Sequence, residues 1–339
     1  MARKKRKKKA RRTSLKLGVA LSLLVSFYTV IAVWFVHHPR AWLDEKQTSL
    51  PSFIIEPLFA VGNVAGDITD ALSITGHDAV YEYDIEAPNG KTLFAGAPKR
   101  IGNPAPNDIL TIDRGHFIIG WSPSERRPVW CAYHVKPQAP YLAGERPKFQ
   151  RDKEAPNSPK PGDFSKTGYD RGHMVPNYAI ATRYGPESQR KTFLMGNIAA
   201  QTPSLNRGPW RELEHRIADL WSKRWGEIWV ITGCYSLEDD SEVLSGSNIK
   251  IADRFYQILL AQDGMNVRAL AIDLPQNISW RSWPARHITT IDELEARTGL
   301  DFLPELPSFI QTPLEAELPT RLWPVSAIDI FKMLSIHFK

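Results

Sequence analysis

The chain has 339 residues, of which 42% are hydrophobic and 24% charged, so it can bury a full-sized core and is neither a disordered chain nor a disulfide-stapled mini-protein. Its formal charge of +6 points at first to an acidic partner such as nucleic acid or an anionic membrane. Ten of the basic residues lie within residues 1–16, which contain no acid, so residues 17–339 carry 33 basic and 37 acidic residues and the isoelectric point does not indicate function.

The first element in the chain is an apolar run at residues 17–36. Its 20 residues carry no charge, and as a helix they would span about 30 Å, the thickness of the hydrocarbon core of a bilayer. We predict a transmembrane helix. It is interpreted as an uncleaved signal anchor, because the bulky Trp34, Phe35 and His37 stand where a cleaved signal peptide has small residues.

The basic residues before this run predict its orientation. By the positive-inside rule, residues 1–16 form a cytoplasmic tail, and the body lies outside, in the periplasm or the extracellular space. Two alternatives stay open. In the first, residues 1–16 are a nuclear or nucleic-acid-binding tail, which leaves the apolar run without a suitable solvent. In the second, the chain is imported into an organelle and its body lies in the intermembrane space.

The rest of the chain divides into a tether at residues 37–79, a domain at 80–305 and a C-terminal tail at 306–339. Segments rich in β-branched and aromatic residues predict strands. They are Val80 to Ile85, Ile109 to Trp121, Pro128 to Val135, Glu227 to Thr232, Arg254 to Leu260 and Val267 to Leu274. Between Pro137 and Asp163, six prolines among many charges predict a long surface loop.

Two helices are predicted in this domain. One begins near Ser204 or Asn206, with an apolar stripe at helical spacing, and the other runs from Ile291 to Thr298 with Gly299 as its C-cap. The stripe consists of Trp210, Leu213, Ile217, Leu220 and Trp221. Because strands and helices do not alternate strictly, we expect an α+β fold with a central, largely antiparallel sheet flanked by helices.

The chain lacks the common phosphate-loop, dinucleotide, zinc-protease and nucleophile-elbow motifs. Its two cysteines, Cys131 and Cys234, exclude a zinc site of four thiolates and leave one disulfide open. What stands out is a group of polar motifs at residues 170–174, 192–201 and 205–214. Residues 166–216 hold eight Lys or Arg against four acids, which favours a compact anion such as a phosphodiester.

Hydrolysis of a phosphodiester needs a base for the water, positive charge for the phosphate and a Lewis acid near the leaving oxygen. His173, titrating near neutrality, is the candidate base, and Arg171 matches phosphate oxygens. Asn206 offers an amide oxygen that suits Mg²⁺.

Two further residues complete this candidate site. Glu214 follows Asn206 by two helical turns, so we expect it on the same helix edge, holding a metal-bound water. We expect Asn197 to orient one of these groups.

Each of these residues also has a structural interpretation. Asn206 would be an ordinary N-cap, and Asp170 and Arg171 a surface ion pair. Residues 113–116 repeat the Asp-Arg-Gly-His sequence in a strand-like stretch with no Asn-bearing helix start close behind, so His116 is interpreted as structural. The tetrapeptide alone is weak evidence, and the prediction depends on the whole set of motifs.

That set resembles the DNA/RNA non-specific endonucleases of the ββα-metal superfamily, from about residue 80 to 305. Further similar segments are Arg127 to Trp130, Val230 to Gly233, Arg254 to Tyr256, Leu274 to Asn277 and Ile291 to Phe302. The resemblance implies a ββα-metal finger in which Asn206 and waters bind one Mg²⁺, or alternatively Mn²⁺, and His173 is the general base.

The same resemblance implies that Arg171 contacts the phosphate, that Asn197 and Glu214 support the site, and that the products are 5′-phosphorylated oligonucleotides. DNA and RNA would be the substrates, and two copies of the chain would pair as a homodimer. Ala218 departs from the pattern, because some members have a phosphate-contacting Arg there, for which Arg207, Arg211 or Arg216 would compensate.

We therefore expect a membrane-anchored, metal-dependent endonuclease with little sequence preference. The alternatives are a catalytically silent nucleic-acid-binding module of the same fold and a phosphodiesterase acting on a small or lipid-linked substrate.

Overall fold

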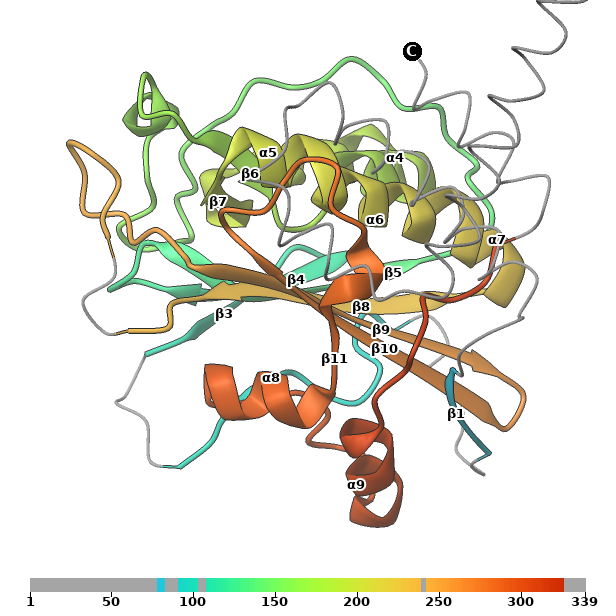
Figure 1. Ribbon diagram of the computed structural model, residues 1–339. Helices are drawn as coiled ribbons and strands as arrows, with labels where there is room; N and C mark the ends of the chain where they lie inside the picture. The colour runs from blue at the N-terminus through green and yellow to red at the C-terminus, as the bar shows by residue number, and fades with distance from the viewer. Residues whose placement is uncertain (1–77, 83–90, 103–107, 239–241, 326–339) are drawn as a thin grey trace, which may run out of the picture. The chain divides into compact units, whose positions relative to one another are not determined.

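A sheet of eight strands forms the centre of the molecule (Figure 1). The computed structural model describes residues 78–82, 91–102, 108–238 and 242–325, all within one compact unit, Ser73–Val325. Neighbouring strands are antiparallel throughout, in the order β1-β10-β9-β8-β5-β4-β3, and β11 pairs with β10. The strands are β1 (Ala79–Glu82), β3 (Leu110–Asp113), β4 (Phe117–Ser122), β5 (Arg127–Val135), β8 (Ile228–Tyr235), β9 (Arg254–Asp263), β10 (Asn266–Pro275) and β11 (Ile288–Thr289).

The predicted tail at residues 1–16, the apolar run at 17–36, most of the tether and residues 326–339 lie outside the described residues. Within the part of the chain that is described, no helix has the length and apolar character needed to cross a bilayer.

Helices cover both faces of the sheet (Figure 1). One face carries α4 (Asn177–Thr192) and a helical run made of α5 (Pro203–Leu205), η3 (Asn206–Trp210), α6 (Arg211–His215), η4 (Arg216–Trp221) and α7 (Ser222–Trp225). The other face carries α8 (Ile291–Thr298) and α9 (Ser308–Ala316). Because side chains on both faces of β5 and β8 are covered, every residue of these two strands is buried. The expected antiparallel sheet flanked by helices is confirmed.

Smaller elements complete the fold. Two short sheets pair β2 (Lys99–Arg100) with β12 (Leu300–Asp301), and β6 (Asp170–His173) with β7 (Ile198–Gln201). Single turns of 3₁₀ helix lie at η1 (Pro161–Phe164), η2 (Met195–Asn197) and η5 (Pro284–His287).

The predicted strand between Ile109 and Trp121 is two strands. β3 and β4 form a hairpin whose turn contains Arg114, Gly115 and His116, with Gly115 at a φ of 87°. The Gly115 N–H donates to the Asp113 carboxylate at 2.7 Å. The first Asp-Arg-Gly-His copy therefore forms a turn, because glycine adopts positive φ without a steric penalty.

Both predicted helices are present, and the apolar stripe of the first is buried. α8 starts and ends at the predicted residues, and Gly299 follows it with a left-handed φ of 67°. α4 was not predicted. Gly185 and Pro186 interrupt it, and the backbone at Gly185 leaves helical geometry, which hides the helical period in the sequence.

A pair of carboxyl groups joins α8 to α9. Glu315 is buried, Glu295 is partly buried, and both face Asp292 and Asp301, while Gln311 donates to Glu315. Burial and then the neighbouring carboxylates raise the pKa of Glu315 to about 8. Burial raises the pKa of Glu295 to about 7, although the Phe302 N–H that it accepts opposes the shift. The contact between these helices is therefore favoured when the pair carries protons.

Removal of the negative charge that Glu315 carries at alkaline pH should stabilise the fold there. Both folded-state pKa values lie above the ordinary 4.5, so the native state holds protons that the unfolded chain releases, and the free energy of unfolding falls as pH rises from 4.5 to about 8. We expect Glu315→Gln to raise the thermal midpoint by a few degrees at pH 9 and to change it little at pH 5. The same substitution at the exposed Glu305 is the control, and a lower midpoint for Glu315→Gln at pH 9 would contradict this account.

Candidate active site

The polar motifs of the sequence form two antiparallel strands followed by a helix. β6 pairs with β7 so that Arg171 lies opposite Ala200 and His173 opposite Ile198. Thr202 follows β7 and caps the helix, its hydroxyl accepting from the Leu205 N–H at 3.4 Å. The helix therefore begins at Pro203, and Asn206 lies at the end of its first turn instead of at the N-cap position.

The helix runs along β6, and two side-chain contacts fix it there. Asn206 Nδ2 donates to the Asp170 carboxylate at 2.9 Å, and Trp210 Nε1 donates to the His173 carbonyl oxygen at 3.1 Å. The regular helix edge expected to carry Asn206 and Glu214 is interrupted, because the backbone at Gly208 leaves helical geometry, with φ −102° and ψ −116°. Asn206 is thus placed beside the start of β6 and Trp210 beside its end.

The Asp170 carboxylate orients the Asn206 amide. Arg207 donates to it twice, from Nε at 2.8 Å and from the terminal nitrogen at 2.7 Å. Hydrogen bonds from Arg207, and then from Asn206, lower the pKa of Asp170, so it is ionised at neutral pH. Because the Asn206 NH₂ group is directed at Asp170, its oxygen is the end available to a cation, and a neutral oxygen beside a carboxylate suits Mg²⁺.

His173 is more enclosed than the sequence analysis expected. Its side chain lies between Phe149 and Phe193, with ring centroids 5.4 and 4.8 Å away, and its residue exposure is 8%. Burial, and then the charge of Arg146, lower the pKa of His173 to about 3, so the expected titration near neutrality is wrong for the free protein. The imidazole is neutral at pH 7. Its Nε2 is buried and has no hydrogen-bond partner among the described residues.

The long loop contributes Arg146, which the sequence analysis missed. Its guanidinium lies 5.6 Å from the centroid of the Phe193 ring, and its charge affects the pKa of both His173 and Glu214. The loop is held there by Gln150, which exchanges backbone hydrogen bonds with Phe193 and Met195 at 3.0 and 2.9 Å. No spacing signal distinguishes Arg146 from the other charged residues of this proline-rich loop.

Arg171 is exposed beside the same aromatic group. Its guanidinium lies 4.9 Å from the Phe149 ring centroid and donates to the Pro161 carbonyl oxygen at 3.2 Å. Arg171 and His173 share one face of β6, because side chains two residues apart in a strand point the same way. Phe149 therefore packs against both.

Glu214 is partly buried one helical turn beyond Trp210. Burial raises its pKa to about 8, while hydrogen bonding to Trp210 and the charges of Arg146 and Arg211 oppose the shift. At pH 7 the free protein therefore holds Glu214 mainly as a protonated carboxyl, whereas the sequence analysis assigned it the role of holding a metal-bound water.

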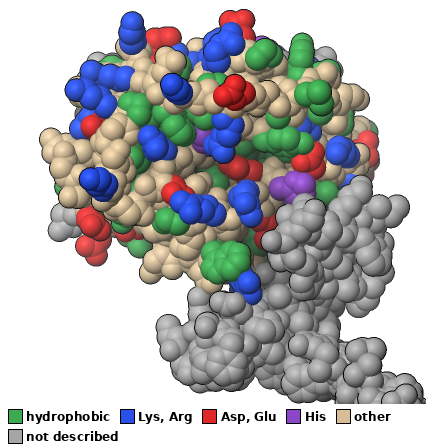
Figure 2. Space-filling model, turned by 90° about the horizontal axis from the view of Figure 1, so that it is seen from above, with side chains coloured by type: hydrophobic (Ala, Val, Ile, Leu, Met, Phe, Trp, Pro, Cys, Tyr) green, Lys and Arg blue, Asp and Glu red, His purple; other side chains and the backbone are tan. Residues whose placement is uncertain are grey.

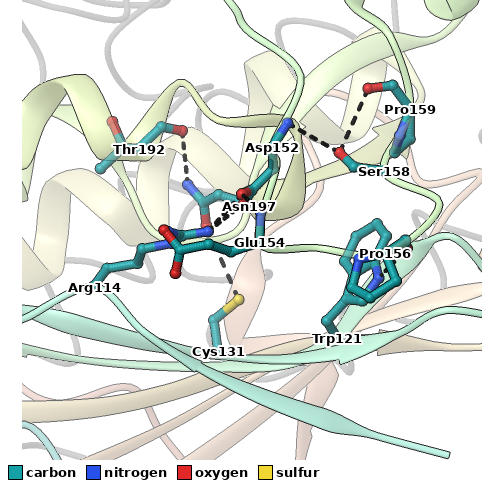
Figure 3. Close-up of polar contacts among 10 residues, drawn as sticks. All are labelled: Arg114, Trp121, Cys131, Asp152, Glu154, Pro156, Ser158, Pro159, Thr192 and Asn197. Carbon is teal, nitrogen blue, oxygen red and sulfur yellow. Dashed lines mark hydrogen bonds and ion pairs between the residues drawn. The ribbon is translucent and has the colours of Figure 1, made fainter.

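Asn197 is a structural residue by its contacts. It is fully buried, its oxygen accepts from the Val175 N–H at 2.9 Å, and its NH₂ group donates to the carbonyl oxygens of Val175 and Thr192, both at 3.0 Å. The Cys131 thiol lies 4.0 Å from its oxygen (Figure 3). Asn197 thus fixes the backbone that follows His173, and none of its hydrogen bonds reaches the side chains that the sequence analysis expected it to orient.

The arginines expected to replace the phosphate-contacting Arg missing at Ala218 differ in whether they are exposed to a substrate. Ala218 is buried, and Arg183 donates to its carbonyl oxygen. Arg216 is buried too, paired with Glu212 at 2.8 Å, so it does not compensate. Arg207 and Arg211 are exposed near the helix start.

The first Asp-Arg-Gly-His copy has a structural role. Arg114 is buried and bonds Asp152 at 2.6 Å and Glu154 at 2.5 Å (Figure 3). His116 bonds Ser188 Oγ at 2.8 Å and stacks on Tyr184. These contacts join the β3–β4 turn to α4 and to the long loop.

Other candidate sites are distinct from this one. Cys131 and Cys234 are both free and buried, so the disulfide left open by the sequence is absent from this structure. Asp292, Glu295 and Glu315 form the one group of possible metal-ligating acids found among the described residues, on the α8 and α9 side of the sheet. The side of the molecule that carries α4 to α7, viewed in Figure 2, presents Lys and Arg side chains among hydrophobic and acidic ones.

This geometry defines a class of protein. An ionised Asp that orients an amide oxygen, a neutral imidazole and nearby arginines are the groups that a metal-assisted phosphodiester hydrolase needs. A family model of DNA/RNA non-specific endonucleases matches residues 96–309, more than half of the chain, and the chain belongs to this family.

Individual relatives agree with that assignment. A nuclease of Nostoc sp. is 27% identical over 242 residues, covering 64% of this chain and 84% of that protein. The mitochondrial nuclease EXOG of Xenopus laevis is 25% identical over 240 residues, covering 66% of this chain and 63% of that protein. A solved EndoG/EndoGI complex superposes with a TM-score of 0.53 at 20% identity, over 61% of this chain and 89% of that chain, a likeness of fold alone.

The structural role of Asn197 predicts a loss of stability on its removal. Asn197→Ala leaves one buried N–H and two carbonyl oxygens without their partner, at a cost on the order of 2–4 kcal/mol in the free energy of unfolding. Asn206→Ala, at a partly exposed position, should cost about 1 kcal/mol. Urea unfolding measures both. If Asn197→Ala kept full stability and lost nuclease activity, Asn197 would instead act in the reaction.

Proposed function

We propose that this protein hydrolyses phosphodiester bonds in DNA and RNA with little sequence preference. The observation that carries the proposal is the pair of contacts that joins the helix to β6, Asn206 to Asp170 and Trp210 to the His173 carbonyl. They hold the helix, with its oriented amide oxygen, beside the short strand that carries the neutral imidazole of His173. Membership in the endonuclease family supports the same activity.

The Asn206 oxygen, together with waters, would hold the Mg²⁺, with Mn²⁺ as the alternative ion. When bound, the ion supplies a positive charge that stabilises the leaving oxygen. Asp170 acts as a positioning residue, because it keeps the Asn206 oxygen turned away from its own carboxylate.

His173, whose imidazole is neutral, accepts the proton of the attacking water. A base with a pKa of about 3 is weak in the free protein. The negative phosphate bound beside Arg146 offsets one of the two causes of that low pKa, so substrate binding itself makes His173 a stronger base. The water oxygen bonds to phosphorus as the P–O3′ bond breaks, and the departing O3′ takes a proton from solvent water. One fragment then carries a 5′-phosphate and the other a 3′-hydroxyl.

Arg146 and Arg171 hold the phosphate. Both guanidinium groups lie against the aromatic side chains that enclose His173, so a phosphate between them lies close to the imidazole. Contacts to phosphates carry no base information, which accounts for the broad specificity proposed.

The proposal extends to the location of the enzyme. Residues 17–36 anchor the chain in a membrane with residues 1–16 in the cytoplasm, and the catalytic domain works outside as a homodimer. The length of the uncharged run and the ten basic residues before it support this orientation.

Loss of either principal residue should abolish cleavage. For the full chain in detergent, His173→Ala and Asn206→Ala should each lower the rate of plasmid and RNA degradation with Mg²⁺ by at least about 100-fold, and a chelator should silence the wild type.

The matched control for this experiment is His116→Ala, in the first copy of the tetrapeptide, which should retain activity if it folds. If His116→Ala folded stably and were the only variant to lose turnover, the catalytic histidine would be in the first tetrapeptide and not in the second. Binding of a labelled duplex without cleavage in Mg²⁺ and Mn²⁺ would instead indicate a catalytically silent binding module.

Arg146 should matter for both binding and catalysis. Arg146→Ala removes a charged hydrogen-bond donor to the phosphate, so kcat/KM should fall roughly 10- to 100-fold, and Arg146→Lys should fall less. Arg151→Ala, five residues further along the same loop, is the control. If Arg146→Ala and Arg151→Ala were equally active, Arg146 would have no part in holding the phosphate.

A further inference from the structure

Trp280 is an exposed aromatic residue beside the start of the catalytic helix. Its residue exposure is 53%, and it is the only tryptophan classed as exposed among the described residues. Its backbone packs so closely on Gly208 that a Cβ at that glycine would lie 2.4 Å from the Trp280 carbonyl oxygen. Gly208 is two residues beyond Asn206, so the backbone of Trp280 lies beside the helix that carries the proposed metal ligand.

The turn that carries Trp280 is fixed to the strand that leads into this helix. Gln276 Nε2 donates to the Ala200 and Ala252 carbonyl oxygens at 2.8 and 3.1 Å, and its oxygen accepts from the Thr202 N–H at 2.9 Å. Thr202, the helix cap, donates in turn to the Gln276 carbonyl oxygen at 2.6 Å. The start of the turn that carries Trp280 is therefore held in place beside the helix cap without substrate.

The residues after Trp280 hold the other end of the turn by a backbone hydrogen bond and by packing. The Ser282 N–H donates to the Ser279 carbonyl oxygen at 3.0 Å, and Trp283 is buried under the guanidinium of Arg216, 4.8 Å from the ring centroid. The Arg281 guanidinium lies 4.4 Å from the Trp280 ring centroid. An exposed aromatic ring accompanied by an arginine is a combination that binds nucleobases by stacking and by charge.

We propose that Trp280 stacks on an unpaired nucleobase of the strand being cleaved, so that the site favours single-stranded over double-stranded nucleic acid. The inference rests on the proposed function for the position of the phosphate. Bases of a duplex are already stacked and paired, and only a single-stranded or extruded base presents a face to the indole. Stacking is tolerant of base identity, in keeping with a non-specific enzyme.

The test compares Trp280→Ala, Trp280→Phe and wild type in the full chain. For a single-stranded oligonucleotide, kcat/KM should fall roughly 5- to 150-fold in Trp280→Ala, the range that loss of one base–aromatic stack corresponds to, and should recover in part in Trp280→Phe. For a duplex of the same sequence it should change less than about twofold. Phe309→Ala, which removes another exposed aromatic side chain, on α9 across the sheet, is the control and should behave as wild type.

Two outcomes separate this inference from the proposed function. If the wild type cleaves nucleic acid and Trp280→Ala lowers kcat/KM equally on both substrates, or on neither, the stacking role is overturned and the nuclease stands. If no variant cleaves, binding of a labelled single strand in chelator still decides: weaker binding by Trp280→Ala alone supports stacking while the proposed function fails, and equal binding overturns both.

Discussion

The site depends on one ionised carboxylate, that of Asp170. It accepts one hydrogen bond from the Asn206 amide and two from one edge of the Arg207 guanidinium, and so fastens the start of a helix to a strand 36 residues away in sequence. An amide has two similar ends, and only a charged acceptor on one side fixes which end faces outward. The orientation of the Asn206 oxygen, the proposed metal ligand, is thus an electrostatic consequence of Asp170.

Around that contact, enclosure controls protonation. Burial lowers the pKa of His173 and raises that of Glu214, so both groups are held in their neutral forms. The main positive charge beside both is Arg146, from a loop that two backbone hydrogen bonds at Gln150 hold against Phe193 and Met195. A phosphate entering this place meets cationic donors and a neutral base, which is the distribution that attack on phosphorus requires.

The fully covered sheet gives these groups a rigid support. β5 and β8 are buried along their whole length, and Asn197, buried where β5 approaches η2, fixes the backbone after His173 with three hydrogen bonds. The first Asp-Arg-Gly-His copy serves the same support, since Arg114 pairs with Asp152 of the long loop. Two identical tetrapeptides therefore have different roles, because one forms a turn under α4 and the other a strand beside a helix.

The sequence by itself determined the family, the positions of most strands, the apolar stripe of the helix after Thr202 and the ends of α8, because each is written in local spacing of side chains. Only the tertiary structure decided the pKa of His173, the structural role of Asn197, the place of Arg146 and the contact between Trp280 and Gly208. Those properties come from burial and mostly from contacts between residues distant in the sequence, and local periodicity carries no record of such contacts.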